Sequence, residues 1–461
     1  MLIEIILLAA LCLLPVMGIV SAFLKSKVFS ILLSVFLLLT IAYAAAALFA
    51  SSASLTLLGI LHFYPFSELF IALFSVLMLL VEVLSYNTKG FPSLQMLMSF
   101  AFISLVAVPS ASNIIIIFMG VELFASLTVL MVLLSGKQHI EASMKFFVLS
   151  AASIAMFSVA LVLLMPYSSD FSIVPQTLAG GALLVIALVF FIAAMSFDTA
   201  MFPFNFWVPD VYEGASANIA AMIAGIGKKL AFVVLIEVLF IFFASLQSTF
   251  SPILAALSIL TMFYGNFAAM VQKKMRRLFA YSSISQAGYI MIGVAVATQY
   301  GIEASIVQIV AHAFMIIAAF AIIMWLEQMN LRTIEDYMGL NSRNKFASIA
   351  LTLLMLSMAG IPPLLGFDGK LLLFSSAISA NMLWLALIGI INSFLSIYYY
   401  GKVISAMFTQ RRYVHVRMSK RVAFVVIVAL AVVVLIGIYP QPVISAAKTA
   451  SASLFSIASS A

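Results

Sequence analysis

Apolar runs of about 20 residues recur along the whole chain, and they leave few folds open to it. The chain has 461 residues, of which 66% are hydrophobic and only 8% are charged, whereas a typical globular protein is about 25% charged. A run of about 20 apolar residues lets a helix cross the roughly 30 Å hydrocarbon core of a bilayer. The alternating pattern of a membrane β-barrel is absent from the sequence. The sequence therefore predicts an all-α polytopic membrane protein, in contact with the lipid bilayer.

Charge and cysteine content exclude several classes of function. The net charge of +7 comes from basic residues dispersed between the apolar runs, so we interpret it as a determinant of topology and expect no nucleic-acid partner. The single cysteine, Cys12, excludes an internal disulfide framework and an iron–sulfur or metal site built on several cysteines. The sequence contains no phosphate loop, no dinucleotide glycine fingerprint and no His pair at haem or zinc spacing. We therefore expect no metal and no cofactor in this chain.

The apolar runs predict 14 transmembrane helices. Residues 1–24 carry Glu4 and no early Lys or Arg, which favours a permanent first span over a signal peptide. The small, weakly polar residues 441–461 are expected to form a surface tail. The predicted spans are residues 2–24, 28–50, 66–86, 92–110, 113–135, 141–165, 179–202, 215–246, 251–272, 279–299, 302–327, 346–376, 381–408 and 421–440.

Basic residues gather on one side of this predicted topology. All those outside the spans follow odd-numbered spans, except Lys448. The positive-inside rule then places both termini outside and the basic loops in the cytoplasm. We expect the membrane to be the plasma membrane of a prokaryote. The residues on the basic side are Lys25, Lys27, Lys89, Lys137, Lys145, Lys273, Lys274, Arg276, Arg277, Arg332, Arg343, Lys345, Lys402, Arg411, Arg412, Arg417, Lys420 and Arg421.

Two of the predicted spans contain prolines that should break the helix. Span seven runs into Pro203 and Pro209, and span twelve contains Pro362 and Pro363; proline removes a backbone donor and clashes with the preceding turn. Proline is common in membrane helices, but the two breaks are five spans apart. Two units of five spans would have opposite topologies, which predicts an inverted repeat. The predicted parts are N-terminal helices 1–3 (residues 1–91), the two repeats (92–246 and 247–408) and a cytoplasmic loop, helix 14 and C-terminal tail (409–461).

Four charged residues lie inside the apolar runs: Glu122, Asp198, Lys228 and Lys370. A charge at the bilayer centre costs about 2.5–3.5 kcal/mol on insertion scales, so we interpret these residues as parts of an ion or proton path. Glu122 could instead bind a neighbouring helix as a packing contact. Asp198, five residues before Pro203, could instead stabilise the kink.

Three further ionisable residues are candidates of the same kind. Lys229 follows Lys228, and adjacent helical residues point about 100° apart, so one should face the bundle interior. The other could reach the membrane surface or pair with a carboxylate such as Glu237. His312 lies inside span eleven, where a structural role and a relay role are equally open.

Four stretches resemble the antiporter-like membrane subunits of respiratory complex I. They are residues 202–215, with the PDVY-x-G-A pattern, 278–289, 357–370 and 141–152. The PDVY form resembles subunit N of NADH-quinone oxidoreductase more than its paralogues L and M or the multisubunit sodium/proton antiporters. The matches run from about residue 115 to residue 405.

The resemblance implies a proton-translocating subunit driven by redox chemistry elsewhere in the complex. Quinone, flavin and iron–sulfur clusters are then expected only in other subunits, and the partners are paralogous antiporter-like subunits and small membrane subunits. The resemblance implies that Glu122, Lys228 and Lys370 are the ionisable residues of spans five, eight and twelve, with His312 near the polar site of span eleven. Secondary candidates are Glu141, Lys145, Lys229 and Glu237.

Asp198 departs from the family pattern. The family commonly has a lysine in span seven, paired with the glutamate of span five, and alignment on Pro203 places Asp198 there. Two close carboxylates cannot both ionise cheaply, so one is expected to hold a proton. In one hypothesis Asp198 pairs with Lys228 while Glu122 stays protonated, and the relay survives. In the other, this half of the molecule is structural.

Two other functions remain open at this stage. The chain could be a subunit of a multisubunit Na⁺/H⁺ antiporter or of a membrane-bound hydrogenase, which share the fold and the lysines. It could also be a structural membrane scaffold, although a scaffold would gain stability by losing its buried charges. The PDVY form favours complex I.

Overall fold

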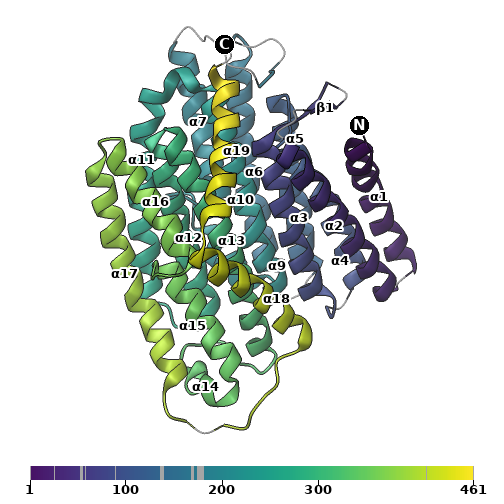
Figure 1. The fold of residues 1–461 in the computed structure, drawn as a ribbon, viewed down its shortest axis with the longest axis vertical. Coiled ribbons are helices and arrows are strands. Elements are labelled where there is room, and N and C mark those ends of the chain that lie inside the picture. The colour runs from purple at the N-terminus through teal and green to yellow at the C-terminus, as the bar shows by residue number, and fades with distance from the viewer. Residues whose placement is uncertain are drawn as a thin grey trace. The chain divides into compact units, whose positions relative to one another are not determined.

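The structure is a computed structural model that describes residues 2–24, 26–51, 55–57, 59–88, 90–134, 140–167, 171–173, 181–411 and 413–459. Nearly all of these residues lie in helices joined by short turns (Figure 1). The strands of the described part are β1 (Leu55–Leu57) and β2 (Leu61–Phe63), which pair as an antiparallel hairpin. The predicted helical class is confirmed.

Contacts divide the chain into two compact units, which are described separately. Unit 1 comprises Met1–Thr199, Ile226–Phe250 and Lys448–Ala461. Its helices are α1 (Leu2–Leu24), α2 (Lys27–Ser51), α3 (Pro65–Ser85), α4 (Phe91–Ala107), α5 (Ile114–Leu134), α6 (Ile140–Leu164), α7 (Ala182–Thr199), α10 (Lys228–Glu237), the π-helix η3 (Val238–Phe242) and the 3₁₀-helix η4 (Ala244–Leu246).

Unit 2 comprises Ala200–Gly225 and Ser251–Ala447. Its helices are α8 (Trp207–Gly214), α9 (Ala217–Met222), α12 (Met275–Val296), α13 (Gln299–Glu327), η5 (Glu335–Tyr337), α14 (Leu340–Arg343), α15 (Lys345–Ala359), α16 (Leu365–Ser379), α17 (Leu383–Phe408), α18 (Lys420–Ala431) and η6 (Val432–Ile436). Three helices have residues in both units: η2 (Ile223–Gly227), α11 (Gln247–Met270) and α19 (Gln441–Ser459).

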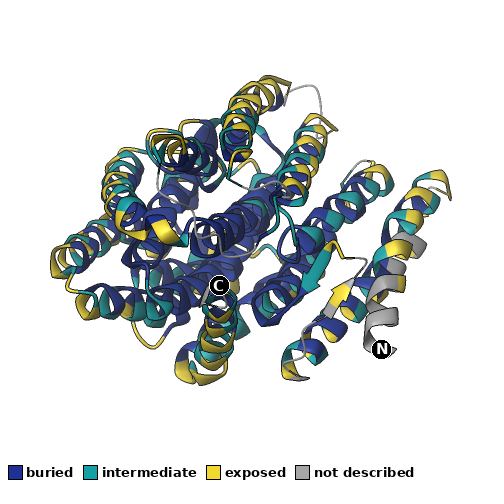
Figure 2. Ribbon diagram, turned by 90° about the horizontal axis from the view of Figure 1, so that it is seen from above, coloured by how far each residue is buried: buried dark blue, intermediate teal, exposed yellow. Residues whose placement is uncertain are grey.

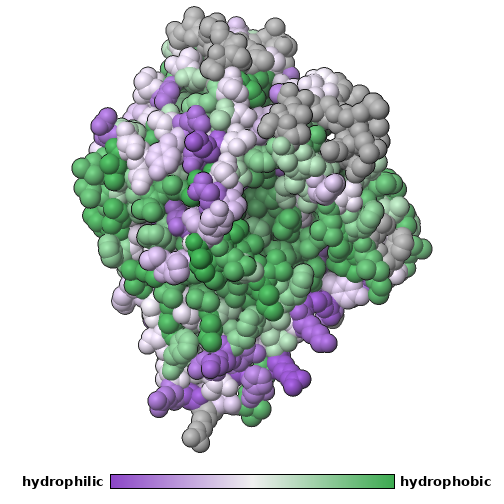
Figure 3. All heavy atoms as spheres, viewed as in Figure 1, coloured by the Kyte–Doolittle hydropathy of each residue, from purple (hydrophilic) through white to green (hydrophobic). Residues whose placement is uncertain are grey.

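The helices differ in how much of their surface the protein covers. Figure 2 shows helices that are buried all round beside helices with one exposed face. The most apolar stretch of α13 is completely buried, whereas 28% of the corresponding stretch of α6 is buried. Figure 3 shows apolar side chains over a broad area of one face, with hydrophilic side chains gathered at the end where Figure 1 places α14. Exposed apolar faces of this kind suit contact with lipid.

Within the described residues, nine helices are long and apolar enough to span a membrane, or ten if α18–η6 and α19 count as one bent span. Shorter apolar helices include α4 and α15. Every predicted span falls on a helix or on a run of consecutive helical segments. Polytopic membrane organisation is therefore confirmed. Four basic residues used to orient the spans lie outside the described residues: Lys25, Lys89, Lys137 and Arg412.

Two broken helices occur where the prolines predicted them. The first break is residues 200–206, between α7 and α8, and the second break is residues 360–364, between α15 and α16. Each begins with a left-handed residue, Ala200 (φ 64°) and Gly360 (φ 87°), which is a common way to end a helix. Each break also contains a cis peptide bond, before Pro203 and before Pro363.

Two details of the sequence prediction are wrong. Pro209 does not break a helix, because α8 begins at Trp207 and places Pro209 in its first turn, where a missing N–H is tolerated. Residues 441–461 do not form a surface tail, because α19 spans Gln441–Ser459. Leu454 is buried, and the hydroxyl of Ser453 accepts a hydrogen bond from the backbone N–H of Phe66 at 3.2 Å.

Candidate functional site

Glu122 and Asp198 lie on neighbouring helices of unit 1. Glu122 is on α5, Asp198 is in the last turn of α7, and α6 packs against both helices. The hydroxyl of Ser153 on α6 donates to Oδ2 of Asp198 at 3.3 Å and to the backbone carbonyl of Ala194 at 3.0 Å. Ionisation of one carboxyl group is expected to disfavour ionisation of the other. The structure therefore brings the two acids together.

Lys228 and Lys229 are both buried at the start of α10, each with 1% of its side chain exposed. The helix that carries them contains a π-helical turn on each side of α10, η2 before Lys228 and η3 after Glu237. Such turns are rare and occur frequently at functional sites. Helix α10 packs against α5 and α7, which carry Glu122 and Asp198. Glu122 and Asp198 thus lie on helices that both contact α10, which carries the two lysines.

Glu237 pairs with a residue that the sequence did not indicate. The phenol of Tyr64, the residue just before α3, donates a hydrogen bond to Oε1 of Glu237 at 2.9 Å. The Oε2 atom of Glu237 has no hydrogen-bond partner among the described residues. Oε1 of Glu237 is therefore bonded to Tyr64, and Lys228 and Lys229 are both buried. The pairing of one of these lysines with a carboxylate stays a prediction.

Lys370 lies on α16 of unit 2 and points back at the second break. Its Nζ donates to the carbonyl of Ala359 at 3.2 Å and to Oγ of Ser393 at 2.9 Å, and it lies 4.2 Å from the ring centroid of Tyr289. Ala359 is the last residue of α15, so its carbonyl belongs to the negative end of that half-helix. A buried ammonium is therefore held by a carbonyl, a hydroxyl and an aromatic face.

His312 lies on α13, one turn after Gln308, and it is completely buried. Gln308 donates through Nε2 to Oε1 of Gln286 at 2.9 Å, and Gln286 donates to the carbonyl of Met358 at 2.9 Å. Met358 immediately precedes Ala359 at the second break. A buried polar chain therefore runs from one turn before His312 to the break that holds Lys370.

A second group of hydrogen-bonded polar side chains lies next to this polar chain, on α11 and α17. Asn266 donates through Nδ2 to the carbonyl and to Oδ1 of Asn392, both at 3.0 Å, and accepts from the phenol of Tyr399 at 3.1 Å. Asn392 is adjacent to Ser393, which contacts Lys370. Neutral hydrogen-bonding groups of this kind can orient water and pass protons without a buried net charge.

The PDVY segment is held by basic residues at the start of α12. Arg277 Nη1 donates to Asp210 at 3.0 Å and to Glu213 at 3.1 Å, and Lys274 also pairs with Glu213. Arg276 forms a two-point ion pair with Glu327 and donates to the carbonyl of Ala215. The basic residues that indicated topology therefore also hold α8, from Asp210 to its C-terminal end.

The secondary candidates Glu141 and Lys145 lie apart from the buried residues. They form an ion pair at 2.9 Å along the first turns of α6, with side chains 81% and 45% exposed. An exposed ion pair of this kind contributes little to stability. A role for these two residues requires a partner surface that covers them.

Two buried acids and several neutral groups were not predicted from the sequence. Glu68 and Glu82 on α3 are 0% and 1% exposed, and neither oxygen of Glu68 has a hydrogen-bond partner among the described residues. Their position inside a predicted apolar span was the signal available for finding them. Gln286, Gln308 and Tyr64 carry no charge and gave no comparable signal.

No cluster of three or more His, Cys, Asp or Glu side chains that could hold a metal ion occurs in the part of the chain that is described. The described part of the chain instead presents buried acids and lysines on helices next to two helix breaks. A polytopic helical protein with such groups belongs to the class of ion-translocating membrane proteins.

The family follows from sequence comparison. Residues 111–396 match the family model of the NADH:quinone oxidoreductase/Mrp antiporter membrane subunits. This chain belongs to that family. The match covers both breaks and the helices that carry Glu122, Lys228, His312 and Lys370.

Several curated relatives are about one-third identical to this chain. Subunit N of the F(420)H(2) dehydrogenase of Methanosarcina mazei is 33% identical over 409 residues, which is 83% of either chain. The NADH-quinone oxidoreductase subunit N of Desulfitobacterium hafniense is 32% identical over 92% of either chain, and that of Methylobacterium nodulans is 33% identical over 77% of this chain and 75% of its own.

Solved structures share the fold at lower identity. A chain of respiratory complex I from Thermus thermophilus has a TM-score of 0.83 at 24% identity, covering 96% of this chain and 99% of its own. A chain of the Mrp complex from Dietzia sp. DQ12-45-1b has a TM-score of 0.89 at 18% identity, covering 99% of this chain and 98% of its own. These likenesses establish the fold alone.

Proposed function

We propose that this chain is a proton-translocating, antiporter-like membrane subunit of a complex I-type quinone oxidoreductase. The observation that carries the proposal is the set of buried lysines and acids beside two helix breaks, in a chain about one-third identical to subunits named N. Redox chemistry in other subunits drives the translocation. Those subunits hold the quinone, flavin and iron–sulfur clusters, and this chain holds none.

The proposed assembly contains paralogous antiporter-like subunits and small membrane subunits, in the plasma membrane of a prokaryote. Relatives of this chain are named as subunits of both an F(420)H(2) dehydrogenase and NADH-quinone oxidoreductases. Purification of the intact complex with identification of its subunits therefore tests the proposal directly. An electron-input module that oxidises NADH or a related two-electron donor is expected. A complex without any electron-input module, as in a cation antiporter, would contradict the proposal.

We also propose 14 spans with both termini outside, and inverted repeats over residues 92–246 and 247–408. Residues 1–91 then add three helices, and residues 409–461 add a cytoplasmic loop and the last helix. The support is the shared construction of the two breaks, each of which follows a half-helix that ends in a left-handed residue. Reporter fusions at residues 137 and 413 are expected to be cytoplasmic. A reporter at residue 56 is expected to be outside.

The proposed proton path uses Glu122, Asp198, Lys228, His312 and Lys370. In unit 1 the support is the packing of α10 on α5 and α7, with two π-helical turns flanking the lysines. In unit 2 the support is the contact of Lys370 with the second break and the glutamine chain beside His312. We assign the three prolines of the breaks, Pro203, Pro362 and Pro363, to shaping the half-helices.

Two forms of the proposal differ in the role that they give to Asp198. In the first, Asp198 takes part in the relay with Lys228, and Glu122 holds a proton. In the second, unit 1 no longer pumps. Asp198→Asn and Glu122→Gln in the assembled complex should each lower the proton-to-electron ratio under the first form, with the exposed Glu335→Gln as the matched control. An unchanged ratio in both variants would leave the second form.

A further inference from the structure

A cavity in unit 1 lies outside the path proposed above. It has a volume of about 410 Å³, and Thr56 and Gly59 at its edge are exposed, so it reaches the surface. A water molecule needs only about 10–15 Å³ of such volume together with polar partners. The cavity therefore has room for a cluster of water molecules.

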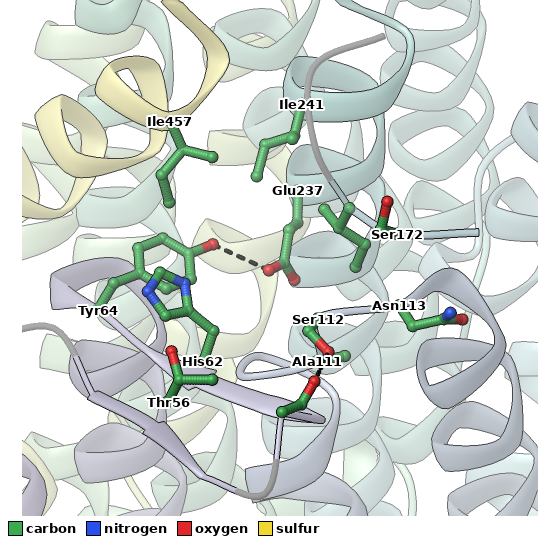
Figure 4. A pocket seen from close by; sticks show the side chains of 12 residues that line it. Thr56, His62, Tyr64, Ala111, Ser112, Asn113, Ser172, Glu237, Ile241 and Ile457 are labelled. Atoms are coloured by element: carbon green, nitrogen blue, oxygen red, sulfur yellow. Dashed lines mark hydrogen bonds between the residues drawn. The ribbon is translucent and has the colours of Figure 1, made fainter. Parts of the chain in front are cut away.

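Residues from segments far apart in sequence line this cavity, and Tyr64 and Glu237 point toward each other across it (Figure 4). Glu237 enters from the end of α10, His62 and Tyr64 come from the hairpin region, and Asn113 and Ser172 come from two other connections. Ile241 and Ile457 form an apolar part of the wall. A mixed wall of this kind holds water against its polar side.

Glu237 is the acidic side chain that lines the cavity, and the hydrogen bonding of its carboxyl group is incomplete. Its side chain is only 1% exposed, Oε1 accepts the hydrogen bond of Tyr64, and Oε2 has no hydrogen-bond partner among the described residues. A buried oxygen without a partner costs about 1–3 kcal/mol. Water in the cavity would supply the missing donor, since Glu237 lines it.

His62 is a further titratable side chain of the cavity and lies nearer to the surface than Glu237. Its ring stacks on Tyr64 with centroids 5.5 Å apart, and it is half-buried on β2, outside the membrane-spanning helices. Burial lowers the pKa of the His62 imidazole below its usual value, so at neutral pH the ring is neutral and able to accept a proton. His62, Tyr64 and Glu237 are the titratable side chains that line the cavity.

The cavity lies on the side opposite the basic loops. Its lining comes from the connections α2–α3, α4–α5 and α6–α7 and from the ends of α10 and α19. These connections follow even-numbered spans of the proposed topology, whereas the basic loops follow odd-numbered ones. The positive-inside rule then assigns the cavity to the outer face.

We propose that this cavity is a water-filled outlet for protons, in which Glu237 exchanges a proton with the outer solution and Tyr64 and His62 position that exchange. The proposal rests on the proposed function and adds an exit to unit 1. The O–H bond of the protonated Glu237 breaks, and a cavity water gains the proton and passes it outward. Tyr64 keeps its own proton while donating to Oε1. Lys229, two turns earlier on α10 and about 12 Å along its axis, is the nearest ionisable residue of that helix for reloading.

A cation site is the competing interpretation of the same cavity. Metal ions prefer several carboxylate or carbonyl ligands, and the cavity wall offers one carboxylate. That scarcity of anionic ligands favours water and protons over a bound cation.

Cysteine accessibility tests the water-filled cavity without reference to pumping. Cys12 is the sole cysteine of the chain, so a Cys12→Ser background permits single substitutions. Glu237→Cys, Ser172→Cys and Ile241→Cys in the assembled complex should react with a membrane-impermeant thiosulfonate from the side opposite the basic loops. Val233→Cys, one turn earlier on α10 and buried outside the cavity, is the matched control and should not react.

Failure of labelling at all three positions, or labelling only from the basic side, would overturn the outlet even if the complex pumps normally. Protection of these positions by Na⁺ or Ca²⁺ alone would overturn it in favour of a cation site. A wild-type complex that does not translocate protons would instead overturn the proposed function, whatever the labelling result.

Proteoliposome measurements test the role of Glu237. Glu237→Gln keeps the shape and the hydrogen bond from Tyr64, and it should lower the proton-to-electron ratio. Tyr64→Phe keeps the carboxyl group, so the ratio should persist while the pH profile of translocation shifts to higher pH. Val233→Ala, at a buried position outside the cavity, should change neither quantity. An unchanged ratio in Glu237→Gln, in a complex that pumps, would contradict the exchange role.

Discussion

The first and second breaks are built alike but hold opposite charges. Each half-helix ends in a left-handed residue, Ala200 in the first break and Gly360 in the second. At the second break the ammonium of Lys370 meets the carbonyl of Ala359, where the negative end of a helix favours a cation. At the first break Asp198 lies in the last turn of α7, where the same helix end disfavours an anion.

The same kind of helix break therefore holds a basic side chain at one position and an acidic side chain at the other. The second break surrounds the amine of Lys370 with a carbonyl, a hydroxyl and an aromatic ring. The first break leaves Asp198 with one long hydrogen bond from Ser153 and a neighbouring acid. An acid in this position is better suited to taking up and losing a proton than to holding a permanent charge.

Removal of the cation should have the largest effect. Lys370→Met in the assembled complex is expected to lower proton translocation by at least roughly tenfold, because a positioned proton-transfer group contributes about 10²–10⁴-fold to a rate. The measurement is the initial rate of acidification in proteoliposomes. Lys345→Met, an exposed lysine at the start of α15, is the control. A wild-type rate in Lys370→Met would mean that the second break holds its charge for structure alone.

The two serines at the breaks should differ next. Ser393→Ala removes a hydrogen bond to the Lys370 ammonium at 2.9 Å and should cost about 1.5–3 kcal/mol, as expected for a bond to a charged group. Ser153→Ala removes the 3.3 Å bond to Asp198 and should cost about 0.5–1.5 kcal/mol. Thermal or denaturant unfolding of the purified complex measures both. Equal losses of unfolding free energy in the two variants would contradict an electrostatic difference between the breaks.

The left-handed residues should respond unequally to exchange. Gly360→Ala should cost about 1–2 kcal/mol, the penalty of a side chain in this conformation, and its Cβ would lie 2.9 Å from Cδ of Lys370. Ala200→Gly relieves that penalty but loses a buried methyl group, so its net effect should stay below about 1 kcal/mol. Unfolding of the purified complex tests the pair. A tolerated Gly360→Ala with wild-type pumping would contradict tight packing around Lys370.

Reversal of the charge at the first break should have the smallest effect on stability. Asp198→Lys places a cation at the C-terminal end of α7 and near Glu122, and it should stabilise the complex by about 0.3–1 kcal/mol. The midpoint of thermal unfolding measures this change, and the proton-to-electron ratio shows whether a lysine also pumps there. Destabilisation would show that the first break depends on its acid.

The sequence predicted the positions of the helices well because each apolar run must pair its own backbone groups within one helix. The breaks were predictable from Pro203, Pro362 and Pro363, whereas Pro209 misled because its effect depends on where the helix restarts. The helix α19 was missed because its apolar residues form one narrow face among small and polar ones.

The candidate site was predictable only where a charge stood out in an apolar run. Glu122, Asp198, Lys228 and Lys370 were found in this way, and the roles proposed for them stay predictions. The hydrogen bond between Tyr64 and Glu237 joins residues 173 positions apart, and no local pattern encodes such a contact. Gln286 and Gln308 were not predicted because a neutral amide in a membrane span costs less free energy than a charge does. An amide is therefore a weaker indication of a functional site.

The complete burial of α13 has a consequence for how the protein is made. This helix is among the most apolar in the chain, yet its most apolar stretch does not face lipid in the folded protein. Its hydrophobicity therefore serves its first partition from the translocation machinery into the bilayer, before the surrounding helices arrive. Gln308 and His312 are exposed to lipid until the surrounding helices pack against α13. The packing of those helices around α13 should therefore be the step of biogenesis that is most sensitive to additional polar residues in α13.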